Sequence, residues 1–340
     1  MRICVFGAGA IGGLVAVKLA AVGEEVTVIA RGAHLAAIRE RGLRLVEEGR
    51  QTVARVRATA LAAEAGPQDV VILGMKAHQL PPVVGEVSAL VGPGTTIVTA
   101  QNGIPWWYFA RHGGPHEGTR LESVDPGGVV AKTLDASRVI GSIIYPAAEL
   151  AEPGVVRHVE GTRITLGELD GADTGRVRAL AEPLRRAGFK ARVTSDIRSE
   201  LWVKLWGNLS FNPVSALTHA TLGDLCGFPP ARQLAAAMMR EAQAVAEKLG
   251  IRFAISIDQR IAAAEAVGAH KTSMLQDVEA GRPTELGALL GAVVELGRIT
   301  GTPTPNLDAV HALASLLERT LRAAGGRLTI ERVAPPGRAR

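Results

Sequence analysis

The chain has 340 residues, which is long enough to form two domains with separate hydrophobic cores. With 47% hydrophobic and 21% charged residues, its composition is that of an ordinary globular protein rather than of a disordered or fibrous chain. The chain has 38 Lys and Arg residues and 33 Asp and Glu residues, and the resulting net charge of +5 suits small anionic ligands. The sequence contains no basic stripe with interleaved aromatic residues, so it does not indicate a nucleic-acid-binding protein.

Cysteine, histidine and hydropathy patterns set further limits on the class of protein. The two cysteines, Cys4 and Cys226, favour a reducing compartment over a disulfide framework. The eight histidines are scattered and no C-x-x-C or H-E-x-x-H spacing occurs, so we expect no metal site. A predicted strand starts at residue 2 and no run of about 18 uncharged apolar residues exists, so we expect neither a signal peptide nor a membrane span. These patterns predict a cytoplasmic protein.

The first predicted strand leads directly into a glycine-rich turn. The apolar run Arg2–Phe6 precedes Gly7-Ala8-Gly9-Ala10-Ile11-Gly12, and a helical pattern follows over 10–22. This strand–turn–helix order is the context in which G-x-G-x-x-G binds the pyrophosphate of a dinucleotide. The first glycine allows the tight turn, the second lets the pyrophosphate approach the backbone, and the third lets the helix pack on the strand. The helix that starts at Ala10 and Ile11 would offer free N–H groups to the phosphates.

The end of the second predicted strand indicates which dinucleotide binds. An NAD-binding chain usually carries an acid about 20 residues after the glycines, where it accepts a hydrogen bond from the ribose 2′-hydroxyl. Here the strand ends in Ala30-Arg31-Gly32, so a guanidinium stands where that carboxylate would be. Arginine suits a 2′-phosphate because it stays charged and binds two oxygens at once. The sequence therefore predicts NADPH, with a solvated loop position for Arg31 as the alternative.

Predicted strands and helices alternate through the rest of the first half. Strands are expected at Ile3–Phe6, Val26–Ala30, Val70–Met75, Thr95–Ala100, Val139–Ile144 and Arg163–Gly167. Nearly continuous apolar runs such as VVILGM are typical of parallel strands that are buried on both faces. With helical patterns at 10–22, 33–41 and 80–90, the sequence predicts an α/β domain of Rossmann type.

Two segments interrupt this alternation. The runs Arg44–Val46 and Thr52–Val56 flank Glu47-Glu48-Gly49-Arg50, which predicts a hairpin insert. The stretch from Trp106 to Asp135 is rich in Gly, His and Pro and contains WWYF, so we expect a long structured insert or a lid near the site.

From about residue 197 the sequence predicts helices only, at 198–211, 230–249, 256–268, 284–300 and 306–324. An all-α domain therefore follows the α/β domain. We expect a nucleotide-binding domain over 1–195, a helical substrate domain over 196–330 and a flexible tail over 331–340.

Polar residues follow two of the predicted strands. Lys76 follows VVILGM and Asn102 follows TTIVTA. Ligands of open α/β sheets bind outside the carboxyl ends of the strands, so both side chains would face the cofactor. A solvated lysine and a simple Asn-Gly turn are the alternatives that the local sequence leaves open.

The helix predicted over 198–211 begins a polar stripe. Lys204, Asn208 and Asn212 fall within about 80° of one another round a helix of 3.6 residues per turn. Trp202 and Trp206 fall roughly opposite, where they would anchor the helix in apolar packing. A solvated helix face is the alternative.

Other residues of the helical half are less informative by themselves. Pro213 directly follows the stripe and is expected to bend or end the helix. Ser273 would make an ordinary helix N-cap, and periodicity alone would assign Asp277 and Glu285 to caps or to the surface.

Taken together, these motifs resemble the ketopantoate reductase (2-dehydropantoate 2-reductase) family over nearly the whole chain. The matching motifs are G-x-G-x-x-G, Lys76-Ala-x-Gln79, Gln101-Asn102-Gly103, Glu200-Leu-Trp-x-Lys204-Leu-x-x-Asn208-x-x-x-Asn212-Pro213, and Ser273-Met-Leu-Gln-Asp277 followed by Glu285. The resemblance implies a Rossmann-type domain followed by an all-α domain like the C-terminal domain of 6-phosphogluconate dehydrogenase, with the site in the cleft. The stretch from Pro105 to Gly128 is longer than in compact members of the family.

The resemblance also implies a reaction, the NADPH-dependent reduction of 2-dehydropantoate to D-pantoate in pantothenate biosynthesis. It assigns the catalytic acid to Lys204 and carboxylate binding to Ser273. With the glycine loop included, the candidate residues are Lys204 and Glu285 for catalysis; Asn208, Asn212, Ser273 and Asn102 for substrate; and Gly7, Gly9, Ala10, Ile11, Gly12, Arg31, Lys76 and Asn102 for cofactor.

Two other functions stay open from the sequence. The Lys-Asn-Asn helix would serve any small anionic 2-oxo acid, so a paralogous reductase is one alternative. A non-catalytic NADP-binding sensor is another, although it would not need Lys204, Ser273 and Glu285 together. The long apolar helices of the second domain would suit the interface of a homodimer, but the sequence does not fix the oligomeric state.

Overall fold

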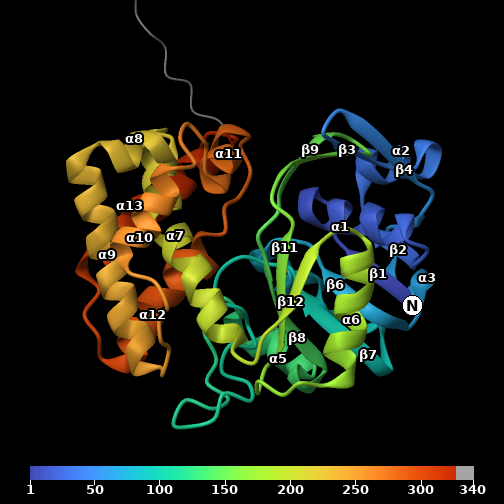
Figure 1. Cartoon of the computed structure of the whole chain (residues 1–340), viewed down its shortest axis with the longest axis horizontal. Coiled ribbons are helices and arrows are strands. Elements are labelled where there is room, and N and C mark those ends of the chain that lie inside the picture. The colour runs from blue at the N-terminus through green and yellow to red at the C-terminus, as the bar shows by residue number, and fades with distance from the viewer. Residues whose placement is uncertain (327–340) are drawn as a thin grey trace, which may run out of the picture.

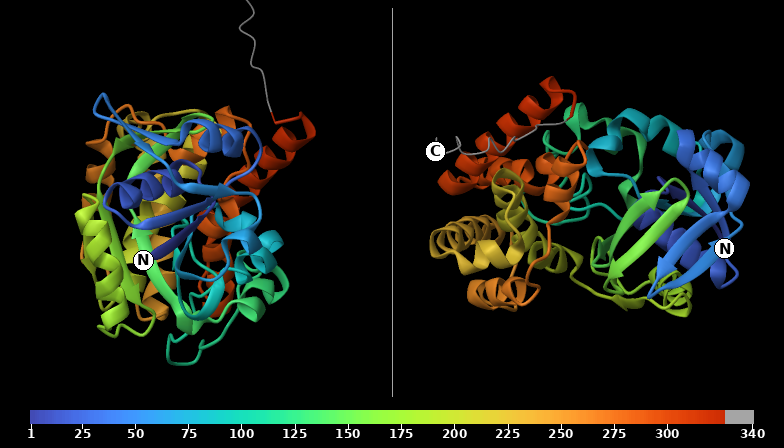
Figure 2. Two further views of the ribbon diagram at one scale, coloured as in Figure 1. Left: turned by 90° about the vertical axis from the view of Figure 1, so that its right-hand side faces the viewer. Right: turned by 90° about the horizontal axis from the view of Figure 1, so that it is seen from above.

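The computed structural model describes residues 1–326 of the chain, so the predicted tail over 331–340 lies outside the described residues. Figure 1 shows two lobes, one built on β-sheets with flanking helices and the other built of helices. Seen from above in Figure 2, the two lobes lie side by side. The last strand, β12 (Lys190–Val193), is followed directly by α7 (Ile197–Thr218), and only helices follow within the described residues. No helix in this range is both long enough and apolar enough to cross a membrane.

The larger sheet has eight strands in the order β12-β11-β8-β7-β6-β1-β2-β5. Neighbouring strands run parallel except β8 and β11, which pair antiparallel. Its strands are β1 (Arg2–Phe6), β2 (Glu25–Ile29), β5 (Arg57–Thr59), β6 (Gln68–Leu73), β7 (Val91–Thr99), β8 (Val139–Ile144), β11 (Arg163–Glu168) and β12. The central strands are buried on both faces, as their apolar runs predict, and the Rossmann-type core is confirmed.

A second sheet has four strands in the order β4-β3-β10-β9. The predicted hairpin insert is confirmed as β3 (Leu43–Glu47) and β4 (Arg50–Ala54). Its partner is a second hairpin, β9 (Ala147–Glu152) and β10 (Val155–Glu160), which the sequence did not predict. Charged residues on the exposed face weaken the apolar pattern of these two strands. The pairing of β10 with β3 also joins segments about a hundred residues apart.

Six α-helices accompany the sheets. They are α1 (Ala10–Ala21), α2 (Gly32–Arg41), α3 (Ala62–Ala65), α4 (Val84–Ser88), α5 (Val129–Thr133) and α6 (Gly175–Arg186). The helix predicted over 80–90 is shorter than expected, because its first residues form a 3₁₀ turn at Pro81–Val83, which follows another 3₁₀ turn at Ala77–Gln79. Adjacent prolines cannot donate the backbone hydrogen bonds of an α-helix.

The predicted insert from Trp106 to Asp135 is structured and packs into the core. Trp107, Tyr108 and Phe109 are each 1% exposed. The Trp107 indole N–H donates to Thr99 Oγ1 at 3.0 Å, and the Trp202 indole N–H donates to the Tyr108 hydroxyl at 2.7 Å. The aromatic residues of the insert therefore join the sheet to α7 rather than forming an open lid.

The helical lobe is arranged around α7. The other helices are α8 (Leu222–Gly227), α9 (Pro229–Lys248), α10 (Ile257–Glu265), α11 (Ser273–Glu279), α12 (Ala292–Thr300) and α13 (Pro305–Ala323). A π-helical turn, Gly287–Gly291, precedes α12 within the segment predicted as one helix over 284–300.

The helix predicted over 198–211 runs further than expected. Pro213 does not end it, because α7 continues to Thr218 and is capped by His219 in the left-handed conformation. Residues around the proline, including Phe211 and Val214, are buried. Tertiary packing thus keeps the helix continuous across Pro213, although proline has no backbone N–H to donate a helical hydrogen bond.

Candidate active site

The glycine loop has the geometry of a dinucleotide-binding turn. Gly7 has φ of +95°, which favours glycine. A Cβ on Gly12 would lie 2.1 Å from the Gly7 carbonyl oxygen, so only glycine allows α1 to pack this closely on β1. A Cβ on Gly9 would meet no atom within 4 Å, and this position is therefore open to a ligand's approach. These three environments fit the pyrophosphate of a dinucleotide.

Arg31 lies at the tip of β2, where the sequence places it. It is the N-cap of α2, and its Nη2 donates to both carboxylate oxygens of Glu86 on α4, at 3.1 and 3.2 Å. The guanidinium is 62% exposed and so can be reached by a phosphate. Glu86 was not among the predicted site residues, since no local pattern connects it with Arg31.

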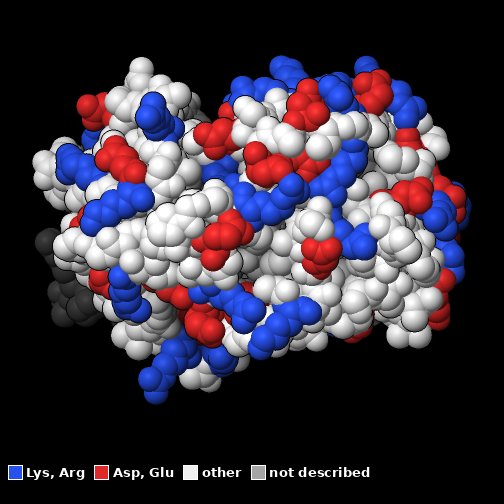
Figure 3. Space-filling view, turned by 90° about the horizontal axis from the view of Figure 1, so that it is seen from below, with Lys and Arg blue, Asp and Glu red and all other residues white. Residues whose placement is uncertain are grey.

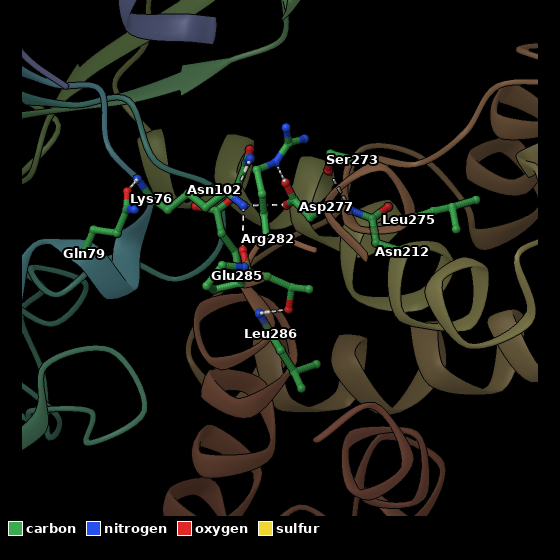
Figure 4. Close-up of polar contacts among 12 residues, drawn as sticks. Lys76, Gln79, Asn102, Asn212, Ser273, Leu275, Asp277, Arg282, Glu285 and Leu286 are labelled. Carbon is green, nitrogen blue, oxygen red and sulfur yellow. Dashed lines mark hydrogen bonds and ion pairs between the residues drawn. The ribbon is translucent and has the colours of Figure 1, made fainter. Parts of the chain in front are cut away.

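Lys76 crosses from the sheet lobe to the helical lobe. Its ammonium donates to the Pro283 carbonyl at 2.6 Å and forms an ion pair of 2.6 Å with Asp277 on α11. Arg282 holds the second oxygen of the same carboxylate at 3.0 Å (Figure 4). Asp277 is only 8% exposed, so the surface position that periodicity favours is wrong.

Glu285 faces the ends of two strands from the opposite lobe. One of its carboxylate oxygens accepts from Asn102 Nδ2 at 3.0 Å and the other accepts from the Ala77 backbone N–H at 3.3 Å (Figure 4). The π-helical turn Gly287–Gly291 begins two residues later, and such turns are frequent at functional sites. Glu285 is therefore not a surface acid.

Lys204 completes a chain of polar contacts. Its ammonium donates to Asn102 Oδ1 at 2.7 Å and to the Ile144 carbonyl. Because an ammonium only donates and a carboxylate only accepts, the Asn102 amide must turn its oxygen to Lys204 and its nitrogen to Glu285. Burial lowers the pKa of Lys204 from its ordinary value of 10.5 to about 8, while the Glu285 carboxylate acts in the opposite direction.

The remaining residues of the stripe extend along α7. Asn208 and Lys204 line a small cavity of about 10 Å³ at the ends of β7 and β8. Asn212 is buried and its Nδ2 lies 3.5 Å from the Ser273 hydroxyl. Thr272, not Ser273, is the N-cap of α11, and this leaves the exposed serine hydroxyl available to a ligand. The two tryptophans of α7 are buried as predicted.

The structure thus places the glycine loop at the carboxyl ends of the strands of the larger sheet. Lys204, whose pKa is lowered, lies on α7 and contacts residues at or just after the carboxyl ends of β7 and β8 of that sheet. A lysine that ionises near neutral pH can donate a proton to a developing alkoxide. The fold and these side chains together define a two-domain, nucleotide-dependent carbonyl reductase.

Family models agree with this class. The model described as "Ketopantoate reductase PanE/ApbA" matches residues 3–112, and the model described as "Ketopantoate reductase PanE/ApbA C terminal" matches residues 196–318. The chain belongs to the ketopantoate reductase family, whose members are pyridine nucleotide-dependent oxidoreductases.

Individual relatives cover almost the whole chain. A 2-dehydropantoate 2-reductase of Mesorhizobium japonicum is 55% identical over 93% of this chain and 98% of its own length. A crystal structure from Ralstonia solanacearum MolK2, attributed to a ketopantoate reductase, is 41% identical with a TM-score of 0.90 and covers 94% of this chain and 98% of its own. The crystal structure of a 2-dehydropantoate 2-reductase from Geobacter metallireducens is 30% identical with a TM-score of 0.82, covering 93% and 99% respectively.

The predicted side chains outside the glycine loop occupy several distinct places in the structure. Lys204, Asn102 and Glu285 form one connected chain, and Asn212 and Ser273 form a second contact along α7. Lys76 is tied to Asp277, and Arg31 lies farther away at the tip of β2. The surface charges on one side of the molecule are mixed in sign (Figure 3).

Proposed function

We propose that the protein reduces 2-dehydropantoate to D-pantoate with NADPH, in the pantothenate pathway, with Lys204 as the general acid. The observation that carries this proposal is the buried ammonium of Lys204, with its pKa of about 8, at the end of a hydrogen-bonded chain to Glu285. Family membership supports the reaction type.

The sheet lobe would hold the cofactor. Gly7, Gly9 and Gly12 leave the backbone open to the pyrophosphate, with the Ala10–Ile11 start of α1 pointing its N–H groups there. Arg31 would bind the 2′-phosphate, in competition with its present partner Glu86. Lys76 and Asn102 would face the nicotinamide half from the ends of β6 and β7. When bound, NADPH supplies the hydride that reduces the keto carbon.

Lys204 would supply the proton. Two of its three N–H bonds are taken by Asn102 and the Ile144 carbonyl, and this leaves one to donate to the keto oxygen of the substrate. As negative charge develops on that oxygen, the ammonium stabilises it and then transfers the proton. Asn102 keeps the amine in position, and Glu285 fixes the orientation of Asn102.

Asn208, Asn212 and Ser273 would bind the substrate on the helical side. The Asn208 side chain lies in the same small cavity as Lys204. The Asn212 amide and the Ser273 hydroxyl lie together farther along α7. Ser273 and the Asn amides would bind the carboxylate and the terminal hydroxyl of the substrate.

The decisive experiment follows NADPH oxidation with 2-dehydropantoate and with a panel of other small 2-oxo acids. We expect the highest kcat/KM with 2-dehydropantoate. A clear preference for another 2-oxo acid would identify a paralogous reductase, and absence of turnover with every acid, despite NADPH binding, would favour the sensor.

We also infer a cytoplasmic homodimer that associates through the helical domain. Leu313 and Leu316 of α13 support this, since they are 55% and 58% exposed on one helix. Light scattering on the purified protein tests it, with Leu316→Lys as a variant expected to shift the protein to a monomer.

A further inference from the structure

The second sheet takes no direct part in the site described above, yet it packs against the helix that follows the glycine loop. A Cβ on Gly13 of α1 would lie 2.6 Å from Val156 Cγ2 of β10. The turn between β9 and β10 also reaches α2, because the Gly154 backbone N–H donates to His34 Nδ1 at 2.9 Å. In Figure 1 this sheet and α2 lie together at one end of the sheet lobe. The second sheet therefore borders the nucleotide loop on two sides.

His34, a half-buried residue in the first turn of α2, joins the second sheet to the glycine loop. Its Nε2 lies 2.7 Å from the Ala8 carbonyl oxygen. A backbone N–H can only donate and a carbonyl can only accept, so Nδ1 must accept from Gly154 and Nε2 must carry the proton that is donated to Ala8. The two contacts thus require one tautomer of the imidazole. Through it, the position of the hairpin turn restrains the Ala8 carbonyl.

The Ala8–Gly9 peptide is a part of the loop that needs such a restraint. The Ala8 N–H donates to the Ile29 carbonyl at 3.3 Å, and the Gly9 carbonyl accepts from the Gly13 N–H at 2.7 Å. The peptide plane between these two groups makes no backbone hydrogen bond within residues 1–326. A Cβ on Gly9 would meet no atom within 4 Å, so sterics do not fix this plane either. The His34 side chain supplies the missing restraint.

The orientation of this peptide decides where a donor of the loop points. No cis peptide bond occurs in the described part of the chain, and in a trans peptide the carbonyl and the N–H point in opposite directions. With the Ala8 carbonyl turned to His34, the Gly9 N–H points away from His34. Among the described residues this N–H finds no acceptor. It is therefore available to a phosphate oxygen that approaches the open position at Gly9.

We propose that His34 is a positioning residue of the cofactor site, which holds the Ala8–Gly9 peptide so that the Gly9 N–H binds the pyrophosphate of the dinucleotide. This inference rests on the proposed function, because it takes the loop to bind NADPH. The second sheet acts through Gly154, which fixes the imidazole. Without His34 the peptide plane can flip, and the Ala8 carbonyl then faces the phosphates, where its dipole repels them.

A purely structural role for His34 would be to attach α2 to the hairpin turn. The two roles affect different parts of the cofactor. Arg31 is the N-cap of α2, so a displaced α2 would impair the contact with the 2′-phosphate, which NADH lacks. A freed Ala8–Gly9 peptide would instead impair the contact with the pyrophosphate, which NADPH and NADH share.

Binding titrations with His34→Ala distinguish these roles. We expect the Kd of NADPH and the Kd of NADH to rise by the same factor, about 3- to 10-fold, which is the effect of one lost hydrogen bond. Binding of adenosine 2′-monophosphate, which has no pyrophosphate, should stay within about twofold. His219→Asn serves as the control, since His219 is exposed at the end of α7 and asparagine tolerates its left-handed conformation.

Two outcomes of these titrations would overturn the positioning role. One is a loss of affinity for NADPH and adenosine 2′-monophosphate but not for NADH, which would show that His34 only places α2 and Arg31. The other is unchanged affinity for both dinucleotides.

Two amide variants separate the two hydrogen bonds of the imidazole. The amide of His34→Gln lies near the position of Nε2 and can still donate to Ala8, so the Kd of NADPH should stay within about twofold of the wild type. The shorter amide of His34→Asn lies near Nδ1 and keeps only the contact with Gly154, so it should weaken NADPH as much as His34→Ala does. The reverse order of affinities would contradict the proposal.

Gly154→Ala tests the contribution of the second sheet. Gly154 has φ of +83°, and its Cβ would lie 3.0 Å from Ala37 Cβ, so the substitution displaces the turn from α2. NADPH affinity should fall in the wild-type background but little further in His34→Ala, because both changes act through one contact. Additive losses would show that the sheet does not act through His34.

These measurements keep the inference separate from the proposed reaction. If the wild type binds NADPH and the His34 variants follow the expected pattern, while no 2-oxo acid is reduced, the proposed reaction fails and the positioning role stands. If 2-dehydropantoate is reduced but His34→Ala binds both dinucleotides as the wild type does, the positioning role fails and the proposed reaction stands.

Discussion

The nucleotide loop and the lysine cluster are built in different ways. The loop is contained in six consecutive residues, and its shape follows from the positive φ of Gly7 and the close contact of Gly12 with the Gly7 carbonyl. The cluster joins Asn102 to Lys204 and to Glu285, which are 102 and 183 positions away from it. The first site depends on local backbone geometry and the second on the packing of two lobes, so they should respond differently to mutation.

The largest effect should come from the lysine. Lys204→Ala removes the proposed acid, and we expect turnover to fall by about 10²- to 10⁴-fold, the range usual for general acid catalysis. NADPH affinity, measured by fluorescence titration, should change little, because the glycine loop is untouched. Lys190→Ala, an exposed lysine of β12, serves as control. Unchanged turnover in Lys204→Ala would refute the role.

Substitutions in the glycine loop test the local site alone. Gly12→Ala should destabilise the protein by about 1–3 kcal/mol, because the new Cβ overlaps the Gly7 carbonyl. Gly9→Ala should leave Tm nearly unchanged, since no protein atom lies within 4 Å, yet it should weaken NADPH binding. Thermal unfolding with and without NADPH distinguishes the two variants; equal loss of stability in both would contradict the comparison.

The pH dependence tests the cluster alone. Reduction needs the Lys204 ammonium, so its rate should fall as pH rises through the lysine pKa of about 8. The Glu285 carboxylate raises the pKa of Lys204, so Glu285→Gln should move this fall to lower pH. Profiles of kcat against pH for the two proteins provide the measurement. A shift to higher pH in Glu285→Gln would contradict the arrangement.

The smallest effect concerns the tip of β2. Glu86 holds the guanidinium that we assign to the 2′-phosphate, at 3.1 Å. Glu86→Gln should therefore tighten NADPH binding by about two- to fivefold, the size of an exposed ion pair, with little effect on NADH. Arg31→Ala should weaken NADPH more than NADH. Equal changes for both cofactors would remove the argument for a 2′-phosphate site.

Much of the site could be predicted because several signals are local. The order of strand, glycine turn and helix placed Gly7, Gly9 and Gly12, and the helical spacing of Lys204 and Asn208 correctly put them on one face. Other features depend on partners that are distant in sequence. The Lys76–Asp277 ion pair, the pairing of Arg31 with Glu86 and the addition of β9 and β10 to the predicted β3–β4 hairpin carry no local pattern, and none was predicted.

The sequence by itself determined the Rossmann-type sheet, the switch to helices after residue 196 and the conformation of the nucleotide loop, because hydrophobic period and glycine sterics act within a few residues. Only the tertiary structure decided that Pro213 stays inside α7, that the WWYF segment is buried between the lobes and that Lys204 meets Asn102 and Glu285 in one hydrogen-bonded chain. These outcomes depend on which surfaces exclude water from one another, and that is settled by packing between distant segments.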